Sequence, residues 1–200
     1  MTKAQMQALD RLDSFVIDPA VDSTTVFKRQ APTALEIGFG MGQALVHFAG
    51  CHPDWNCIGV DVYRPGIGSL VLQCEQQNIK NVRIVEADAL SVLESLEDNS
   101  IELIMVFFPD PWPKKRHHKR RLITPAFGTL ASRKLNSGGR MRLATDWLPY
   151  AQSIVEALQG NPQLDGGISE RWPLRLQTRF EERAQRLRHP VQDFCYTKVE

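Results

Sequence analysis

One short segment, residues 103–108, constrains the fold of this chain more than any other. Its six residues, L-I-M-V-F-F, are all apolar, which is typical of a strand covered on both faces, as in a parallel sheet flanked by helices. The run stops at a proline, and prolines at 109, 111 and 113 exclude both helix and ladder pairing beyond it. The pattern predicts a core strand whose carboxyl end carries a stiff, extended segment.

This stiff segment brings an acid and an aromatic ring to the end of the strand. It contains Asp110 and Trp112, and it leads into residues 114–121, which hold six cations and two histidines. Open α/β sheets bind ligands at the carboxyl ends of their strands, so we expect a functional carboxylate beside a basic surface. The alternative is a buried strand followed by a solvated basic loop, because charge runs are usually just solvated.

A glycine-rich turn follows a second apolar strand. Residues 33–42 read T-A-L-E-I-G-F-G-M-G and run into a helix-like segment. Glycines permit a tight turn and a close approach of the backbone to a ligand. A dinucleotide fingerprint would require glycine where Gln43 stands, and Glu36 would repel a pyrophosphate but suits an ammonium or sulfonium ligand. This disfavours a nicotinamide oxidoreductase, and an ordinary glycine turn is the alternative.

Acids end two further predicted strands, residues 56–62 and 81–88. Asp61 lies where a dinucleotide-binding fold grips a ribose hydroxyl pair, and an acid at Asp88 could accept a hydrogen bond from an adenine amino group. Each alone could be a cap or loop carboxylate. Together with Glu36, they place acids at three successive strand ends, and we expect them to line one pocket.

The rest of the chain alternates strand and helix patterns. We expect a short helix within residues 5–15 and a loop at 159–167; further helices are predicted at 66–78, 89–96, 122–135 and 149–158, and further strands at 140–146 and 191–199. This order predicts an α/β protein with a mostly parallel sheet, helices on both faces and a hairpin-like closing edge. We expect residues 1–200 to form a single domain, with residues 1–30 as a helical lead-in.

The charge distribution and the cysteine content indicate which kind of protein this is and which kind of ligand it binds. The net charge is +1, yet twelve of the 24 lysines and arginines lie in residues 114–121 and 171–188. Two local basic segments on an otherwise acidic body predict a polyanion site, and we expect both segments to contact phosphates. The four cysteines lack metal-ligand spacing, and neither a signal peptide nor a membrane span is evident. We therefore expect a cytoplasmic protein with no metal and no membrane partner.

Several motifs resemble one family closely. They are E-I-G-F-G-M-G, G-V-D-V-Y-R-P-G-I-G, F-F-P-D-P-W-x-K-x-R-H-x-K-R-R, A-T-D-W-x-P-Y-A and T-R-F-E-x-R. They are similar to those of the bacterial tRNA (guanine-N7-)-methyltransferases, which are class I enzymes dependent on S-adenosylmethionine (SAM). The resemblance implies a Rossmann-like fold with a seven-stranded sheet and an antiparallel closing strand. It also implies methyl transfer to N7 of a guanine in the tRNA variable loop (position 46), by a monomer or homodimer.

The resemblance also implies roles for individual residues. Asp110 is expected at the reacting guanine as the catalytic residue. The expected cofactor-binding residues are Glu36, Gly38, Gly40, Gly42, Asp61, Asp88 and Asp110. The expected substrate-binding residues are Lys114, Asp146, Thr178, Arg179, Phe180 and Glu181.

The chain departs from the family pattern in three places. Its N-terminal arm is shorter than usual, position 179 is Arg where Lys is common, and Ala184 and Arg188 stand where the family has glycines. The alternative hypothesis is therefore a catalytically weak or inactive RNA-binding paralogue that retains the fold.

Overall fold

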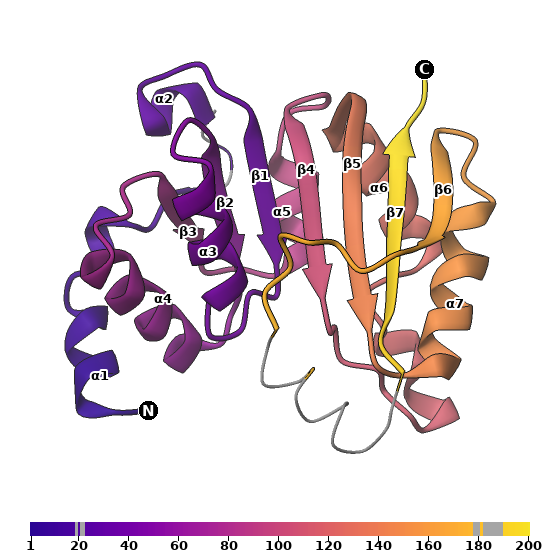
Figure 1. Ribbon diagram of the computed structural model, residues 1–200, viewed down its shortest axis with the longest axis horizontal. Coiled ribbons are helices and arrows are strands. Elements are labelled where there is room, and N and C mark those ends of the chain that lie inside the picture. The colour runs from indigo at the N-terminus through magenta and orange to yellow at the C-terminus, as the bar shows by residue number, and fades with distance from the viewer. Residues whose placement is uncertain (19, 21–22, 178–180, 182–189) are drawn as a thin grey trace.

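The protein is built around one seven-stranded sheet. The computed structural model describes residues 1–200 except 19, 21–22, 178–180 and 182–189 (Figure 1). The strands are β1 (Thr33–Ile37), β2 (Asn56–Val60), β3 (Val82–Val85), β4 (Ile101–Phe107), β5 (Leu135–Thr145), β6 (Leu164–Ser169) and β7 (Gln192–Lys198). Their order is β3-β2-β1-β4-β5-β7-β6, and β7 alone runs antiparallel to its neighbours. The predicted mostly parallel sheet with an antiparallel closing strand is confirmed.

Helices cover both faces of the sheet. They are α1 (Lys3–Leu9), α2 (Ser23–Phe27), α3 (Gln43–Cys51), α4 (Arg64–Gln76), α5 (Ala89–Ser95), α6 (Pro125–Lys134) and α7 (Leu148–Gln159), with 3-10 turns η1 (Leu12–Ser14) and η2 (Lys115–Arg120). Apolar side chains of α1, α3 and α4 share one buried cluster, and those of α5, α6 and α7 share another. The sheet therefore separates two hydrophobic cores.

Strand β4 illustrates why this sheet must be buried on both sides. Ile104 and Val106 belong to the core beneath α5, α6 and α7, whereas Leu103, Met105 and Phe107 belong to the core beneath α3 and α4. Successive side chains of a strand point to opposite faces. A continuous apolar run thus serves two cores at once, as the sequence predicted.

One predicted loop is in fact a strand. Residues 159–167 were expected to form a loop, but Leu164–Ser169 is β6, which pairs with β7 at the edge of the sheet. A Cβ at Gly166 would collide with the carbonyl oxygen of Cys195 on β7. Glycine is needed here for close backbone approach, so the loop prediction was wrong for residues 164–167.

The N-terminal residues are attached to the outer surface of α4. The short predicted helix appears as α1 followed by η1, and Arg11 donates two 2.7 Å hydrogen bonds to the carboxylate of Glu75. Within the described part of the chain, no helix is both long and apolar enough to cross a membrane.

Candidate active site

A cleft of about 330 Å³ opens at the carboxyl ends of the central parallel strands. Its volume lies in the range of small-molecule sites. The cleft is lined by residues that follow β1, β2, β3 and β4: Ile37, Gly38, Val60, Asp61, Val62, Ala87, Asp88, Ala89, Val106, Pro109, Asp110, Trp112, Arg120 and Leu122. Four predicted site residues, Gly38, Asp61, Asp88 and Asp110, therefore meet in one cavity.

The glycine turn after β1 has the conformation that its glycines predict. Gly38, Gly40 and Gly42 have φ values of +70°, +55° and +81°, all in the left-handed region. A Cβ at Gly42 would lie 2.7 Å from the Cδ1 atom of Leu70 on α4. Left-handed backbone and lack of space both select glycine at this position. The turn thereby brings bare backbone to the rim of the cleft.

Asp61 fixes the glycine turn and still faces the cleft. Its Oδ2 atom accepts a 2.8 Å hydrogen bond from the Gly40 N–H, and its Oδ1 atom accepts one of 2.9 Å from the Tyr63 N–H. An ionised carboxylate has about four acceptor positions. Asp61 can therefore hold the loop and accept bonds from ligand hydroxyls at the same time.

Glu36 lies behind the turn, on the central strand β1, and is only 3% exposed. Burial, together with the nearby charge of Asp61, raises its pKa to about 8. Its Oε2 atom has no hydrogen-bond partner among the described residues. An unpartnered buried carboxyl oxygen costs free energy unless a donor or a cation reaches it. This atom is therefore suited to a positively charged ligand.

Asp88 has a structural role as well as a place in the cleft. Its Oδ1 atom accepts hydrogen bonds from the Leu90 and Ser91 N–H groups, at 3.0 and 3.1 Å, and caps α5. The sequence left open whether Asp88 is a helix cap, and the structure shows that it is. The second oxygen makes no described hydrogen bond, which leaves it available to a ligand.

The segment after β4 is held in a strained conformation. Phe108 and Trp112, which flank residues 109–111, have φ values of +54° and +44°. Left-handed backbone at such bulky residues costs about 1–3 kcal/mol each and persists only where the surroundings enforce it. Asp110, between them, is exposed and lines the cleft. Strain of this kind clusters at functional sites.

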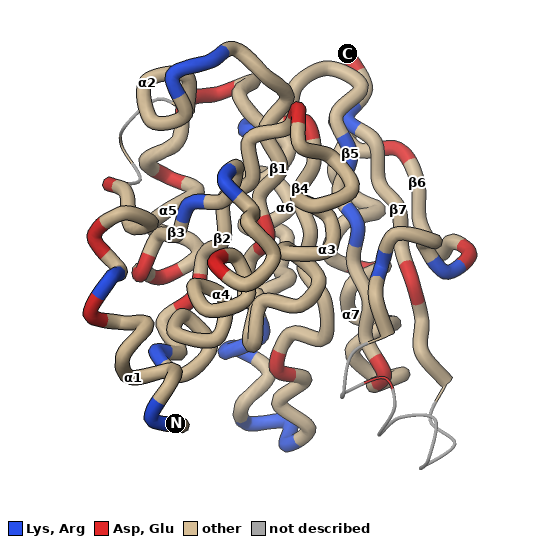
Figure 2. Tube along the Cα trace, turned by 60° about the vertical axis from the view of Figure 1, so that its left-hand side comes forward, with Lys and Arg blue, Asp and Glu red and all other residues tan. Residues whose placement is uncertain are grey.

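The basic segment folds back over Trp112. The guanidinium carbon of Arg120 lies 5.0 Å from the centre of the indole ring, and the ring of His117 meets the indole edge-on at 5.8 Å. Figure 2 shows blue positions on the loop that projects from the edge at which the parallel strands end. Lys114, Lys115, Arg116, Lys119 and Arg120 are all exposed. The cleft therefore borders a cationic surface.

Two of the arginines expected to contact phosphates are buried instead. Arg121 is 6% exposed; it donates hydrogen bonds to the Pro111 carbonyl and, at 2.6 Å, to Ser153 Oγ, and it lies 4.8 Å over the ring of Tyr150. Arg175 is 1% exposed and forms ion pairs with two carboxylates. The phosphate prediction is wrong for both, because their guanidinium groups are already satisfied inside the protein.

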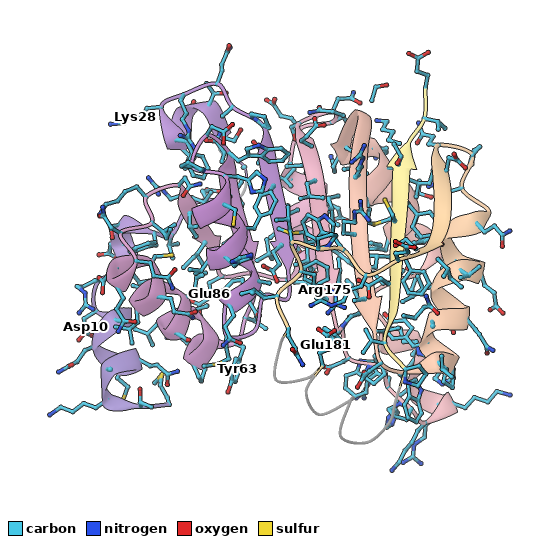
Figure 3. All side chains as sticks on the ribbon, in the orientation of Figure 1. Asp10, Lys28, Tyr63, Glu86, Arg175 and Glu181 are labelled. Atoms are coloured by element: carbon cyan, nitrogen blue, oxygen red, sulfur yellow. The ribbon has the colours of Figure 1, made fainter. Side chains whose placement is uncertain are left out.

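The carboxylates that hold Arg175 are Asp193 and Glu181; Figure 3 labels Arg175 and Glu181. Glu181 was predicted to bind substrate, but it is buried and also pairs with Arg171 at 3.1 Å. Burial alone would raise the pKa of Glu181, but the two guanidinium groups outweigh it and hold that pKa below its usual value. Asp193 was not predicted. The available signal was an acid on a final strand with buried aromatic neighbours, Phe194 and Tyr196.

The remaining predicted residues lie outside the cleft or outside the described chain. Lys114 and Asp146 follow β4 and β5 respectively but do not line the cavity. Gly40 and Gly42 shape the turn rather than the cavity wall, and the buried Glu36, which was expected to line the pocket, does not line it either. Thr178, Arg179 and Phe180, like Ala184 and Arg188, fall outside the described residues.

Comparison with known proteins agrees with this geometry. The family described as "Putative methyltransferase" matches residues 30–194. The chain is 43% identical to the tRNA (guanine-N(7)-)-methyltransferase of Pseudomonas entomophila over 210 residues, covering 100% of this chain and 88% of that protein. It is 44% identical to that of Methylococcus capsulatus over 207 residues, covering 99% and 90%.

Solved structures extend the comparison to the fold. A 16S rRNA (adenine(1408)-N(1))-methyltransferase from Catenulisporales acidiphilia, determined with SAM, has a TM-score of 0.63 at 13% identity and covers 92% of each chain. An rRNA methylase from Streptococcus thermophilus has a TM-score of 0.60 at 12% identity and covers 100% of this chain and 99% of the other. Full-length identity of this order, with the matching fold, shows that the chain belongs to the tRNA (guanine-N(7)-)-methyltransferase family.

Proposed function

We propose that this protein transfers a methyl group from SAM to N7 of a guanine in tRNA, at position 46 of the variable loop. The supporting observation is the cleft that joins Gly38, Asp61 and Asp88 to Asp110, in a chain 43% identical to proteins that bear this activity as their name. The exposed cations beside the cleft suit an RNA partner.

The residues in and directly behind the cleft fit the proposed cofactor. The unpartnered buried Oε2 atom of Glu36 suits a ligand that carries both ammonium and sulfonium charge. The carboxylate of Asp61 has acceptor capacity for ribose hydroxyls, and the unbonded oxygen of Asp88 can accept from an adenine amino group. Bound SAM supplies an electrophilic methyl group on a sulfonium centre.

The reaction requires the protein mainly to align the two reactants and to stabilise the developing charge. Guanine N7 already carries an in-plane lone pair, so no general base is required to expose the nucleophile. Methylation leaves a positive charge on the purine, and the carboxylate of Asp110 stabilises that developing charge. Holding the two reactants in line contributes several kcal/mol more.

Trp112 offers a surface for the target base. It lines the cleft next to Asp110, and stacking of a base on an aromatic ring contributes roughly 1–3 kcal/mol. Because the target guanine must leave its packed position in tRNA, some extrusion cost is expected. The exposed cations from Lys114 to Arg120 would contact the flanking phosphates and make binding depend strongly on salt.

A methyl-transfer assay on defined RNA tests this proposal. The protein is incubated with methyl-labelled SAM and an unmodified tRNA transcript that carries guanine at position 46, and the product is digested and separated. We expect 7-methylguanosine, and no label in a matched transcript with adenine at position 46. Tight tRNA binding without any N7 product would instead favour the inactive RNA-binding paralogue.

A further inference from the structure

Arg175 is the largest fully buried side chain of the described structure, and it is charged. Its guanidinium group donates four hydrogen bonds to two carboxylates: two of 2.9 Å to Asp193, and two of 2.6 and 3.2 Å to Glu181. Arg171 supplies a second cation to Glu181 and donates to the backbone carbonyl of Arg175. Two cations and two anions make a cluster with no net charge, as a buried cluster requires.

The cluster adjoins the start of the catalytic segment, which is the stretch of residues 108–112 after β4 that carries Asp110. The guanidinium carbon of Arg175 lies 5.3 Å from the ring centre of Phe108, the residue that follows β4. The Phe108 N–H donates to the Ala144 carbonyl at 2.8 Å, and Ala144 is paired with Asp193 in the β5–β7 register. Ala144 therefore links Phe108, just beyond β4, to Asp193 on β7, and Arg175 contacts both Phe108 and Asp193.

Phe108 is the point at which the direction of the catalytic segment is set. Its φ of +54° is a left-handed conformation that a phenylalanine keeps only when its surroundings impose it. Prolines 109 and 111 fix their own φ angles, so the short stretch beyond Phe108 has few ways to bend. A change in the backbone angles of Phe108 would therefore displace Asp110, because the prolines leave little freedom to compensate for it.

We propose that Arg175 is a positioning residue for methyl transfer. By holding Glu181 and Asp193 while lying over the ring of Phe108, it fixes the conformation from which residues 109–112 present Asp110 to the cleft. The inference rests on the proposed function, because Asp110 is assigned its role there. Arg175 itself is not among the residues that line the cleft.

A conservative variant separates this role from simple stability. Lysine in Arg175→Lys keeps the positive charge but lacks the planar face and the fork that binds two carboxylates. We expect kcat to fall by about tenfold to a hundredfold, the loss that an ångström-scale misplacement of a reacting group produces. SAM affinity should fall much less than kcat, because Gly38, Asp61 and Asp88 follow other strands and keep their places in the cleft.

The matched control is a buried cation at the opposite end of the sheet. Lys134 is 3% exposed and donates 2.6 and 2.7 Å bonds to the Leu96 carbonyl and to Asp98. Lys134→Met should lower the melting temperature and leave kcat per folded molecule at the wild-type value. Phe108→Leu removes the aromatic ring under Arg175 but no ion pair, and it should reproduce the kcat loss. It replaces Arg175→Lys as the test if that variant does not fold.

The decisive measurement is kcat with saturating tRNA, alongside calorimetric SAM binding and the folded fraction of each variant. A kcat loss in Arg175→Lys or Phe108→Leu, with SAM affinity much less affected and Lys134→Met normal, supports the inference. Full kcat per folded molecule in the site variants, or a loss shared equally by Lys134→Met, overturns it. Wild-type protein that binds SAM but transfers no methyl group would overturn the proposed function and the inference with it.

Discussion

The buried carboxyl of Glu36 predicts an unusual pH dependence of stability. Its pKa is raised from 4.5 to about 8 in the folded protein by burial and by Asp61, whereas in the unfolded chain it is ordinary. The folded state therefore binds more protons than the unfolded state between about pH 4.5 and 8. In this window stability falls as pH rises, by up to 1.36 kcal/mol per pH unit, and the contribution is lost once pH passes the folded pKa.

The size of the effect follows from the two pKa values. The difference between 4.5 and about 8 corresponds to about 5 kcal/mol above pH 8, and to about 3 kcal/mol at pH 7, where folded Glu36 is still mostly protonated. Glu36→Gln cannot ionise and should lack this slope. Its stability relative to wild type should therefore rise by about 1 kcal/mol per pH unit between pH 5 and 8 and then level off.

Urea unfolding followed by circular dichroism at unit steps from pH 5 to 9 measures the difference. Glu94→Gln, an exposed acid-to-amide change on α5, is the control and should track wild type at every pH. Any constant offset from placing an amide in this site does not matter, because the prediction concerns the slope. A difference between wild type and Glu36→Gln that stays constant with pH would refute the reasoning.

Three further substitutions test the proposed roles. Asp110→Ala should abolish turnover at saturating SAM while tRNA affinity persists, since the carboxylate acts on developing charge; filter binding and single-turnover kinetics check this, and full activity would remove its assigned role. Lys114→Ala should weaken tRNA binding and reduce the slope of log K against log salt by about 0.7–0.9, the value of one phosphate contact; an unchanged slope would contradict the contact. Arg121→Met should leave that slope at the wild-type value but lower stability by about 1–3 kcal/mol, because it leaves the Pro111 carbonyl without its donor; thermal unfolding measures the loss, and a shallower slope would mean that Arg121 reaches RNA after all.

Parallel topology explains why much of the site could be predicted. Acids at the ends of successive parallel strands share one edge of the sheet, so Glu36, Asp61 and Asp88 were predicted to line one pocket. Asp61 and Asp88 do line the cleft, whereas Glu36 lies behind it. The left-handed glycines after β1 followed from the same strand-to-helix reasoning. Both predictions use only local sequence and a topology that the alternating pattern favours.

Burial of charge could not be predicted in the same way. Arg121 and Arg175 read as exposed cations because their partners, Ser153 and Asp193, lie 32 and 18 residues away in the chain. Strand β6 was missed for a related reason. Its D-G-G sequence has no apolar alternation, and it becomes a strand through pairing with β7. In each case a tertiary contact overrides the local signal.

In the proposed reaction, Asp110 and the cofactor cleft act together on one guanine. Wild-type protein and Asp110→Asn should be assayed side by side on a tRNA transcript with guanine at position 46, with chemical cleavage at 7-methylguanosine to locate the product. Cleavage at position 46 with wild type, and none with Asp110→Asn when SAM saturates both proteins, is the predicted result. Cleavage at position 46 of equal strength with both proteins would contradict it.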